Sequence, residues 1–251
     1  QSSLDTGVVP EDWSSQCDSP VQKGTEGKPG NYRPVSLTSV VGKLLETIIR
    51  DRINLHLEEY GLIRDSQHGF VKGRSCLTSL LEFFDEVTER LGKGSGVDVV
   101  YKDFQKAFDK VPHERLVRKI EAHGIKGTVA ARIQSWLGDR KQRVVVNGCF
   151  SDWREVYSGV PQGLVLGPLL FLIYINDLDL GIPSTISKFA DDTKLGRVVN
   201  SEKDSSQLQE HIDRMVKWAD TWQMNFNVEK CEVMHFVRKN EGRQYRLVIQ
   251  S

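Results

Sequence analysis

The order of helical and strand-like segments is the feature of this sequence that most restricts its fold. Apolar residues recur at helical spacing in several segments, and two other stretches are typical of β-hairpins. The expected helices are 38–61, 76–91, 112–124, 128–137, 165–178 and one that contains 208–222; the expected hairpins are 142–156 and 186–199, and the expected single strands are 97–104, 224–228 and 232–237. Because strands do not alternate strictly with helices, this order predicts an α+β fold.

Composition and charge exclude several classes of protein. Of the 251 residues, 39% are hydrophobic and 27% are charged, which is typical of a globular chain with a packed core. Lysine and arginine together number 34, as do aspartate and glutamate, so the net charge is zero. A basic nucleic-acid module normally carries an excess of positive charge. Binding of a polyanion therefore has to rest on local patches or on segments outside this chain.

Cysteine spacing and hydropathy bear on the compartment. The four cysteines are widely and irregularly spaced, which excludes a zinc ribbon and a disulfide-rich secreted scaffold. The first ten residues lack the pattern of a signal peptide, and the longest apolar run, 164–175, is too short to cross a bilayer. We expect an intracellular protein of the nucleus or cytoplasm that does not contact a membrane.

Three aspartates stand where strands end or turn. Asp103 ends an apolar strand, whereas Asp191 and Asp192 lie at the tip of an expected hairpin. If the strands are neighbours in one sheet, three carboxylates converge, and they would repel one another unless cations lie among them. Such oxygen ligands suit Mg²⁺, and because paired ions lie about 4 Å apart, we expect the side-chain oxygens to lie roughly 4–8 Å apart without metal. Aspartate is also common in turns, which is the ordinary explanation for the pair at 191 and 192.

Two glycine-containing loops have the composition of anion-binding segments. In SGVPQGLVLGPLLF (158–171), glycine permits close backbone approach to a ligand, and the helix behind Gly163 presents N–H groups to an anion. In QHGFVKGRSC (67–76), Lys72 and Arg74 flank a glycine ahead of a helix, and Arg74 is suited to hold a phosphate. The simpler alternatives are a plain connection between a loop and a helix, and a solvated basic turn.

Taken together and in order, these segments resemble the reverse transcriptases of non-LTR (LINE-type) retrotransposons, from about residue 31 to 239. The sequence NYRPVSLTSVVGKLLE resembles the first fingers motif of that family and QHGFVKGRSC the second. YKDFQKAFD resembles palm motif A, SGVPQGLVLGPLLF motif B, FADD motif C and MNFNVEKCEVMHF motif D. The resemblance implies a right-hand polymerase with fingers and palm.

The resemblance also implies site residues and partners. Asp103, Asp191 and Asp192 match the metal-binding carboxylates, with a backbone carbonyl from Phe104, and the implied metals are two Mg²⁺ ions with Mn²⁺ as a substitute. Phe108 matches the aromatic gate beneath the sugar, Gln162 and Gly163 the nucleotide pocket, Lys72 and Arg74 the triphosphate side, and Lys230 a proton donor to pyrophosphate. The implied partners are an RNA template, a DNA primer and dNTPs.

Three positions depart from the family pattern. Lys102 stands where an apolar residue is usual, and strand alternation places it on the side of Val100 and Phe104, so we expect a buried ammonium. Gln105 and Leu164 each replace a residue that is usually a small serine, and Leu164 is expected to crowd the nucleotide pocket. These departures favour a second hypothesis, a decayed and catalytically silent protein that binds nucleic acid. A third alternative is a maturase similar to those of group II introns.

The expected domain organisation follows the resemblance. We expect a poorly ordered N-terminal segment at 1–30, a fingers and palm domain at 31–240 and a C-terminal tail at 241–251. The thumb is expected to be largely missing, and no endonuclease motif precedes the match.

Overall fold

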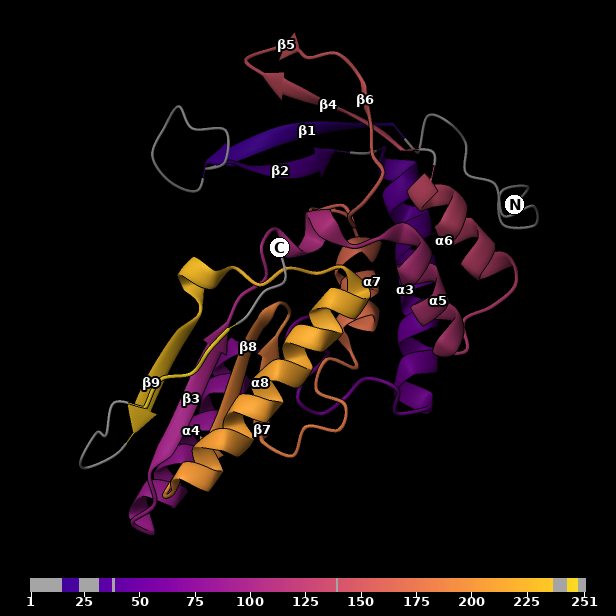
Figure 1. Ribbon diagram of the computed structural model, residues 1–251. Coiled ribbons are helices and arrows are strands. Elements are labelled where there is room, and N and C mark those ends of the chain that lie inside the picture. The colour runs from indigo at the N-terminus through magenta and orange to yellow at the C-terminus, as the bar shows by residue number, and fades with distance from the viewer. Residues whose placement is uncertain (1–14, 23–31, 38, 139, 237–242, 248–251) are drawn as a thin grey trace. The chain divides into compact units, whose positions relative to one another are not determined.

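The computed structural model describes residues 15–22, 32–37, 39–138, 140–236 and 243–247 (Figure 1). Within these ranges the expected mixture of helices and antiparallel hairpins is confirmed. The chain forms two compact units: unit 1 comprises Gln1–Leu62 and Phe108–Tyr174, and unit 2 comprises Ile63–Ala107 and Ile175–Ser251.

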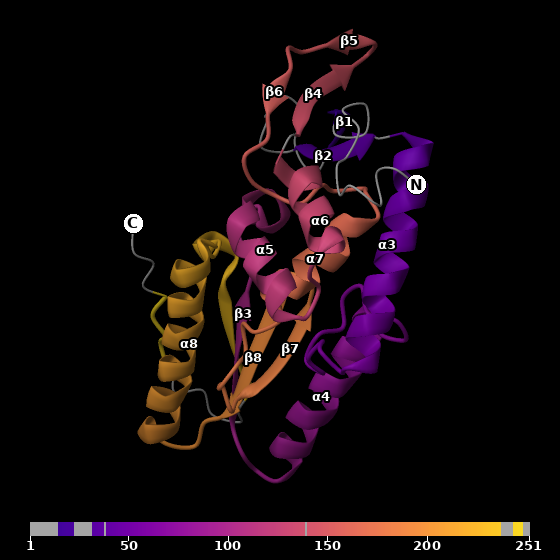
Figure 2. The same ribbon diagram turned by 90° about the vertical axis from the view of Figure 1, so that its right-hand side faces the viewer.

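Unit 1 contains a small sheet and most of the helices. Its strands are β1 (Ser15–Gln22), β2 (Tyr32–Leu37), β4 (Lys141–Val146), β5 (Cys149–Phe150) and β6 (Arg154–Glu155). Its helices are α3 (Val40–Glu59), α5 (His113–Ala122), α6 (Thr128–Gly138) and α7 (Leu166–Ile175), whose last residue lies in unit 2. The strands lie at one end of α3 and α6 (Figure 2). The hairpin expected at 142–156 is confirmed, and Asn147 and Gly148 have the positive φ values of 50° and 78° that a type I′ turn requires.

The strand β1 corrects the expectation of a segment without regular structure at the N-terminus. Residues 15–22 pair antiparallel with β2 and parallel with β4. The sequence of β1 is rich in polar residues and does not by itself indicate a strand. The strand forms through pairing with β2 and β4, which both come later in the chain. The rest of 1–30 lies outside the described residues.

Unit 2 is an antiparallel sheet covered by one helix on each face (Figures 1 and 2). The strand order is β7 (Thr185–Phe189), β8 (Asp192–Val198), β3 (Val97–Lys102) and β9 (Glu232–Phe236). The helices are α4 (Cys76–Gly92) and α8 (Glu202–Trp222). Phe83 and Val87 of α4 pack against Val97 and Val99, and burial of such side chains stabilises the unit by about 1.5–3 kcal/mol each.

The strand expected at 224–228 does not form. Phe226 makes a single bridge with Phe104, and Val228–Lys230 is a short 3₁₀ helix. Among the residues that the structure describes, no helix is long and apolar enough to cross a membrane.

Candidate active site

Two of the three aspartates are placed at one end of the sheet of unit 2. Lys102, the last residue of β3, pairs with Thr193 of β8, so Asp103 and Asp192 follow at the next position of the same antiparallel register. Asp192 is the first residue of β8, which means that the turn of this hairpin consists of Ala190 and Asp191 rather than of the two aspartates. The hairpin is therefore confirmed, and its turn is shifted by one residue.

A lysine ammonium lies among these carboxylates. The Nζ of Lys230 donates a hydrogen bond to Oδ2 of Asp103. That hydrogen bond, together with the negative charges of Asp103, Asp192 and Asp191, raises the pKa of Lys230 above its ordinary value. In the described part of the chain, no group of three acidic, histidine or cysteine side chains is close enough to hold a metal ion. The expected spacing of 4–8 Å between the carboxylate oxygens stays a prediction.

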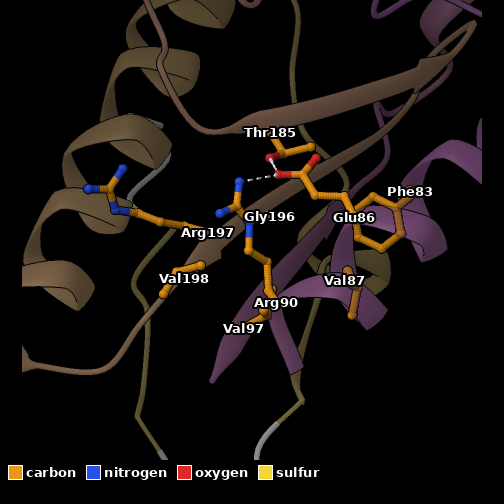
Figure 3. A pocket seen from close by; sticks show the side chains of 9 residues that line it. All are labelled: Phe83, Glu86, Val87, Arg90, Val97, Thr185, Gly196, Arg197 and Val198. Atoms are coloured by element: carbon orange, nitrogen blue, oxygen red, sulfur yellow. Dashed lines mark hydrogen bonds and ion pairs between the residues drawn. The ribbon is translucent and has the colours of Figure 1, made fainter. Parts of the chain in front are cut away.

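Room for a ligand differs sharply between the two ends of this sheet. Beside Asp103 and Asp192 lies an open cavity of about 520 Å³, which is within the usual size of small-molecule sites. Lys230 and Glu229 also line it. At the other end, the pocket in Figure 3 has a volume of about 20 Å³, enough for roughly one water. A nucleotide-sized ligand fits only the first of these two.

The turn that carries Asp191 is held by Gln67, a residue that no sequence pattern marks as functional. The buried side-chain oxygen of Gln67 accepts hydrogen bonds from the backbone N–H groups of Ala190, at 2.9 Å, and Gly69, at 2.8 Å. Ala190 has a φ of +55°, a conformation that costs energy for a residue with a Cβ. Gln67 therefore satisfies the backbone of a strained turn beside the carboxylates.

Phe108 and Gln162 are brought close to each other within unit 1. The ring of Phe108 stacks on Phe171 with centroids 4.4 Å apart, and its carbonyl accepts a hydrogen bond from the N–H of Val160 at 2.7 Å. The side-chain amide of Gln162 donates to Oδ1 of Asp109 at 3.0 Å. The segment around Phe108 and the loop at 158–163 are thus joined by several hydrogen bonds.

The expectation of an anion-binding helix behind Gly163 is wrong for the first two N–H groups of that segment. The N–H groups of Val165 and Leu166 donate to Oε2 of Glu46, at 2.9 and 3.1 Å. Burial raises the pKa of Glu46, although these two hydrogen bonds and the charge of Arg140 oppose the shift. The negative group at this helix terminus is supplied by the protein itself, a stabilising arrangement with the helix dipole.

Gly163 allows the loop to pack closely against strand β2. Its φ is +88°, and a Cβ at this position would lie 2.9 Å from Cγ1 of Val35. The glycine is explained by approach to strand β2, so contact with a ligand is not needed to account for it.

Comparisons with known proteins assign the family. The family model described as reverse transcriptase (RNA-dependent DNA polymerase) matches residues 21–247. The chain belongs to the reverse transcriptase family. This finding confirms the resemblance to reverse transcriptases on which the assignment of motifs depends.

Several curated relatives of this reverse transcriptase domain come from insect mobile elements, and they confirm the resemblance to LINE-type elements. It is 30% identical over 82% of its length to the probable RNA-directed DNA polymerase from transposon BS of Drosophila melanogaster. It is 29% identical over 94% of its length to the RNA-directed DNA polymerase from mobile element jockey of the same species. The chain covers 24% of the first relative and 27% of the second, and so spans about a quarter of their length.

Solved structures show that the fold is that of the polymerase fingers and palm. Apo telomerase from Candida tropicalis, truncated from its C-terminal domain, matches with a TM-score of 0.67 at 13% identity. The match covers 94% of this chain and 52% of that one. At this identity the likeness establishes the fold alone.

The two basic residues expected on the triphosphate side have different surroundings in the reverse transcriptase domain. Arg74 donates to the carbonyl of Gln67 at 2.8 Å, and to the carboxylate of Asp65 at 2.8 Å. Arg74 therefore holds the loop that contains Gln67, whereas Lys72 is exposed. Their contact with a phosphate stays a prediction, as does the metal-binding carbonyl of Phe104, whose ring is buried and stacks on Phe226 at 4.3 Å.

The buried ammonium expected at Lys102 is confirmed. Its side chain is 3% exposed, and Nζ lies 3.4 Å from the carbonyl of Ile212 and 4.6 Å from the ring centroid of Phe226. Burial lowers the pKa of Lys102 to about 7, and the Cys231 and Asp213 groups oppose the shift only weakly. Leu164 is also buried, within unit 1.

Replacing Gly69 with alanine is expected to destabilise unit 2 and to displace the turn at Asp191. A Cβ on Gly69 would lie 2.4 Å from the backbone nitrogen of Ala190, and neither backbone can move without breaking the hydrogen bonds of Gln67. We expect a loss of about 1–3 kcal/mol or more in the free energy of unfolding, measured by urea denaturation. The control is Gly92→Ala, where the Cβ meets nothing within 4 Å; an equal loss there would contradict the prediction.

Proposed function

We propose that this chain contributes RNA-directed DNA polymerase activity, the transfer of a nucleotide from a dNTP to the 3′-hydroxyl of a primer. The observation that carries the proposal is the placement of Asp103 and Asp192 at one end of the palm sheet, beside Asp191 and an open cavity. Several curated relatives, among them those from transposon BS and mobile element jockey, are named as RNA-directed DNA polymerases, and these names support it. An RNA template, a DNA primer and dNTPs are the proposed partners.

The negative charge at this end of the sheet supports binding of a divalent metal, although the described side chains do not form a complete three-ligand site in this structure. Three carboxylates act on one cationic group, Lys230, so the site already favours positive charge. In the proposal, Asp103, Asp191, Asp192 and the carbonyl of Phe104 hold two Mg²⁺ ions, with Mn²⁺ as a substitute. When bound, such ions supply activation of the attacking hydroxyl and stabilisation of the leaving oxygen.

The remaining residues have roles that do not involve a metal. Lys230 keeps its proton because its pKa is raised, and it is proposed to protonate the departing pyrophosphate. Phe108, fixed by Phe171 and Val160, is proposed to exclude a ribose 2′-hydroxyl. Gln162 is proposed to contact the nucleotide and Lys72 the triphosphate.

A second function is favoured by one observation. Lys102 places a buried ammonium next to Asp103 in the chain, and misplacement of a catalytic carboxylate by ~1 Å costs ~100-fold in rate. A protein that binds nucleic acid but does not extend primers fits this observation.

Primer extension on poly(rA)/oligo(dT) tests the proposal. We expect extension with Mg²⁺ or Mn²⁺, and loss of extension to background in Asp103→Asn and in Asp192→Asn. The matched control is Asp85→Asn, which removes an exposed carboxylate of α4 and should leave extension unchanged. Extension by the Asp103→Asn variant at the parental rate would refute the assignment. Absence of extension by a parent that still binds the primer–template favours the silent alternative.

A further inference from the structure

The hairpin of unit 1 exposes aromatic side chains around an arginine. The guanidinium of Arg143 lies 4.1 Å from the ring centroid of Phe150 and 4.5 Å from that of Trp153. Nevertheless, Phe150 is 57% exposed, Trp153 is 43% exposed and Tyr157, just beyond the hairpin, is 81% exposed. Aromatic side chains usually supply burial, so three exposed rings within eight positions of one another need a reason other than the core.

The local backbone brings the two rings to one arginine. Val145 pairs with Phe150, but Lys141 pairs with Glu155, so the register shifts by one residue between these two pairs. Such a shift is a β-bulge. The N–H of Ser151 still donates to the carbonyl of Val144 at 3.0 Å, so the extra residue lies after Ser151, where Asp152 and Trp153 together oppose Arg143. In a regular strand, residues 150 and 153 would point to opposite faces; the bulge puts both on the face of Arg143.

The guanidinium of Arg143 contacts the rings of Phe150 and Trp153, and the exposed surface of each ring remains available to a ligand. Cation–π contact with Arg143 orients the rings before any ligand arrives, which lowers the entropy that binding has to overcome. A planar group that stacks on the outer face of Phe150 or Trp153 would extend the stack. Lys141 and Arg154, both exposed, place cations on the same hairpin.

We propose that this hairpin binds single-stranded nucleic acid by stacking unpaired bases on Phe150 and Trp153, with phosphates on Arg143 and Lys141. Exposed aromatic faces beside cations are the recurring means of binding unpaired strands, because every base has a face that stacks. Duplexes fit poorly, since their bases are already stacked on one another. Asp152 and Glu155 reduce the positive charge of the hairpin, so stacking carries more of the affinity than charge does. The site is independent of the carboxylates of unit 2.

The test measures affinity by fluorescence anisotropy with the whole chain. The probes are fluorescein-labelled oligouridylate and oligothymidylate of about 15 nucleotides, and a duplex of equal length. We expect both single strands to bind more tightly than the duplex. Phe150→Ala and Trp153→Ala should each weaken single-strand binding about 5- to 100-fold, the usual effect of losing one stacking ring. Arg143→Gln should lower the slope of log affinity against log salt by about one.

Control variants separate stacking from folding. Phe150→Tyr and Trp153→Phe keep a ring and should retain affinity within about threefold, a difference well below the loss of a stacking ring. Phe84→Ala removes an exposed phenylalanine of α4 and should leave single-strand affinity unchanged. Unchanged affinity in the Phe150→Ala/Trp153→Ala double variant overturns the proposal. Failure of the parent to bind either single strand also overturns it, and would indicate that the rings contact a protein instead.

Discussion

Replacing Lys102 with methionine is expected to raise the free energy of unfolding by on the order of 3–5 kcal/mol at pH 7. The ordinary lysine pKa of 10.5 falls to about 7 in the folded chain, and each unit of difference corresponds to about 1.4 kcal/mol. The unbranched thioether occupies the space of the aliphatic stem and carries no charge into the core. The carbonyl of Ile212, at 3.4 Å, is the polar partner given up, and a weak hydrogen bond of this length contributes little.

The lowered pKa of Lys102 also predicts how the free energy of unfolding changes with pH. Because the folded pKa is lowered, the unfolded chain binds more protons between pH 7 and 10.5, and stability rises with pH across that window. Below about pH 7 both states are protonated, so the full cost of the buried charge is present. The parent should therefore gain stability from pH 7 to 10 relative to Lys102→Met, in which this contribution is absent.

Urea unfolding of both proteins at pH 6, 7, 8 and 9 checks the prediction. The control is Lys203→Met, which removes an exposed lysine from the first turn of α8 and should change stability by less than about 0.5 kcal/mol. Parallel pH profiles for the parent and Lys102→Met would show that Lys102 titrates normally, and would contradict the burial argument.

The burial of Lys102 and the placement of Asp103 and Asp192 at one end of the sheet were predictable from the alternation of side chains along a strand and from strand pairing. The apolar run that ends in Asp103 predicts a buried strand, and alternation places Lys102 on the face of Val100 and Phe104, which the structure buries. The FADD hairpin pairs with this strand in an antiparallel register. Periodicity of two is enough to orient these side chains. The turn was misplaced by one residue because Ala190 adopts a positive φ that composition does not suggest.

Helix periodicity was less decisive because α3 and α4 each carry two apolar stripes. On α3 the structure buries Ile49 and Ile53 and exposes Val40, Leu44 and Ile48, although all five recur at helical spacing in the sequence. On α4 it buries Phe83 and leaves Leu77, Leu81 and Phe84 exposed. A sequence with apolar residues around most of a helix does not specify which side meets the core.

The sequence did not predict the residues whose side chains form hydrogen bonds with backbone groups far away in the chain. Glu46 accepts hydrogen bonds from N–H groups about 120 positions later, and Gln67 from Ala190. Their identity as polar residues inside helical or glycine-containing segments indicates solvent exposure rather than burial. Only the tertiary fold brings them to unsatisfied N–H groups, whose burial without a partner would cost about 1–3 kcal/mol each.

Asp179→Asn is expected to lower the free energy of unfolding by about 3–5 kcal/mol, the usual cost of removing one member of a buried ion pair. Lys188 is 0% exposed, and its Nζ donates to Oδ1 of Asp179 at 2.8 Å. Oδ2 of Asp179 accepts from the hydroxyl of Ser66 at 2.6 Å. Burial alone would raise the pKa of Asp179, but the charge and hydrogen bond of Lys188, together with the hydrogen bond from Ser66 and the charge of Arg64, hold this pKa below its ordinary value. An amide cannot supply the charge that Lys188 needs.

Loss of the ion pair is expected to affect the candidate active site through the backbone hydrogen bonds of Lys188. Its N–H donates to the carbonyl of Ser66 at 2.7 Å, and its carbonyl accepts from the N–H of His68 at 2.8 Å. These bonds flank Gln67, which holds the turn at Asp191. Loss of the ion pair should therefore loosen the 66–69 loop before the rest of unit 2, and amide hydrogen exchange at His68 and Ala190 should report it.

Two further variants separate the ion pair from a general loss of charge. Glu89→Gln breaks the exposed pair with Lys93 on α4 and should leave the free energy of unfolding almost unchanged, because water screens exposed pairs. The double variant Asp179→Leu/Lys188→Met removes both charges and should recover most of the stability lost in Asp179→Asn, because an apolar pair in a buried site is often as stable as an ion pair. The contribution of Asp179 should also vanish as pH falls through its lowered folded pKa, so the difference between the parent and Asp179→Asn narrows in acid and persists at neutral pH. If Asp179→Asn costs no more than Glu89→Gln, then Lys188 is neutral in the folded chain and the ion pair does not hold the loop.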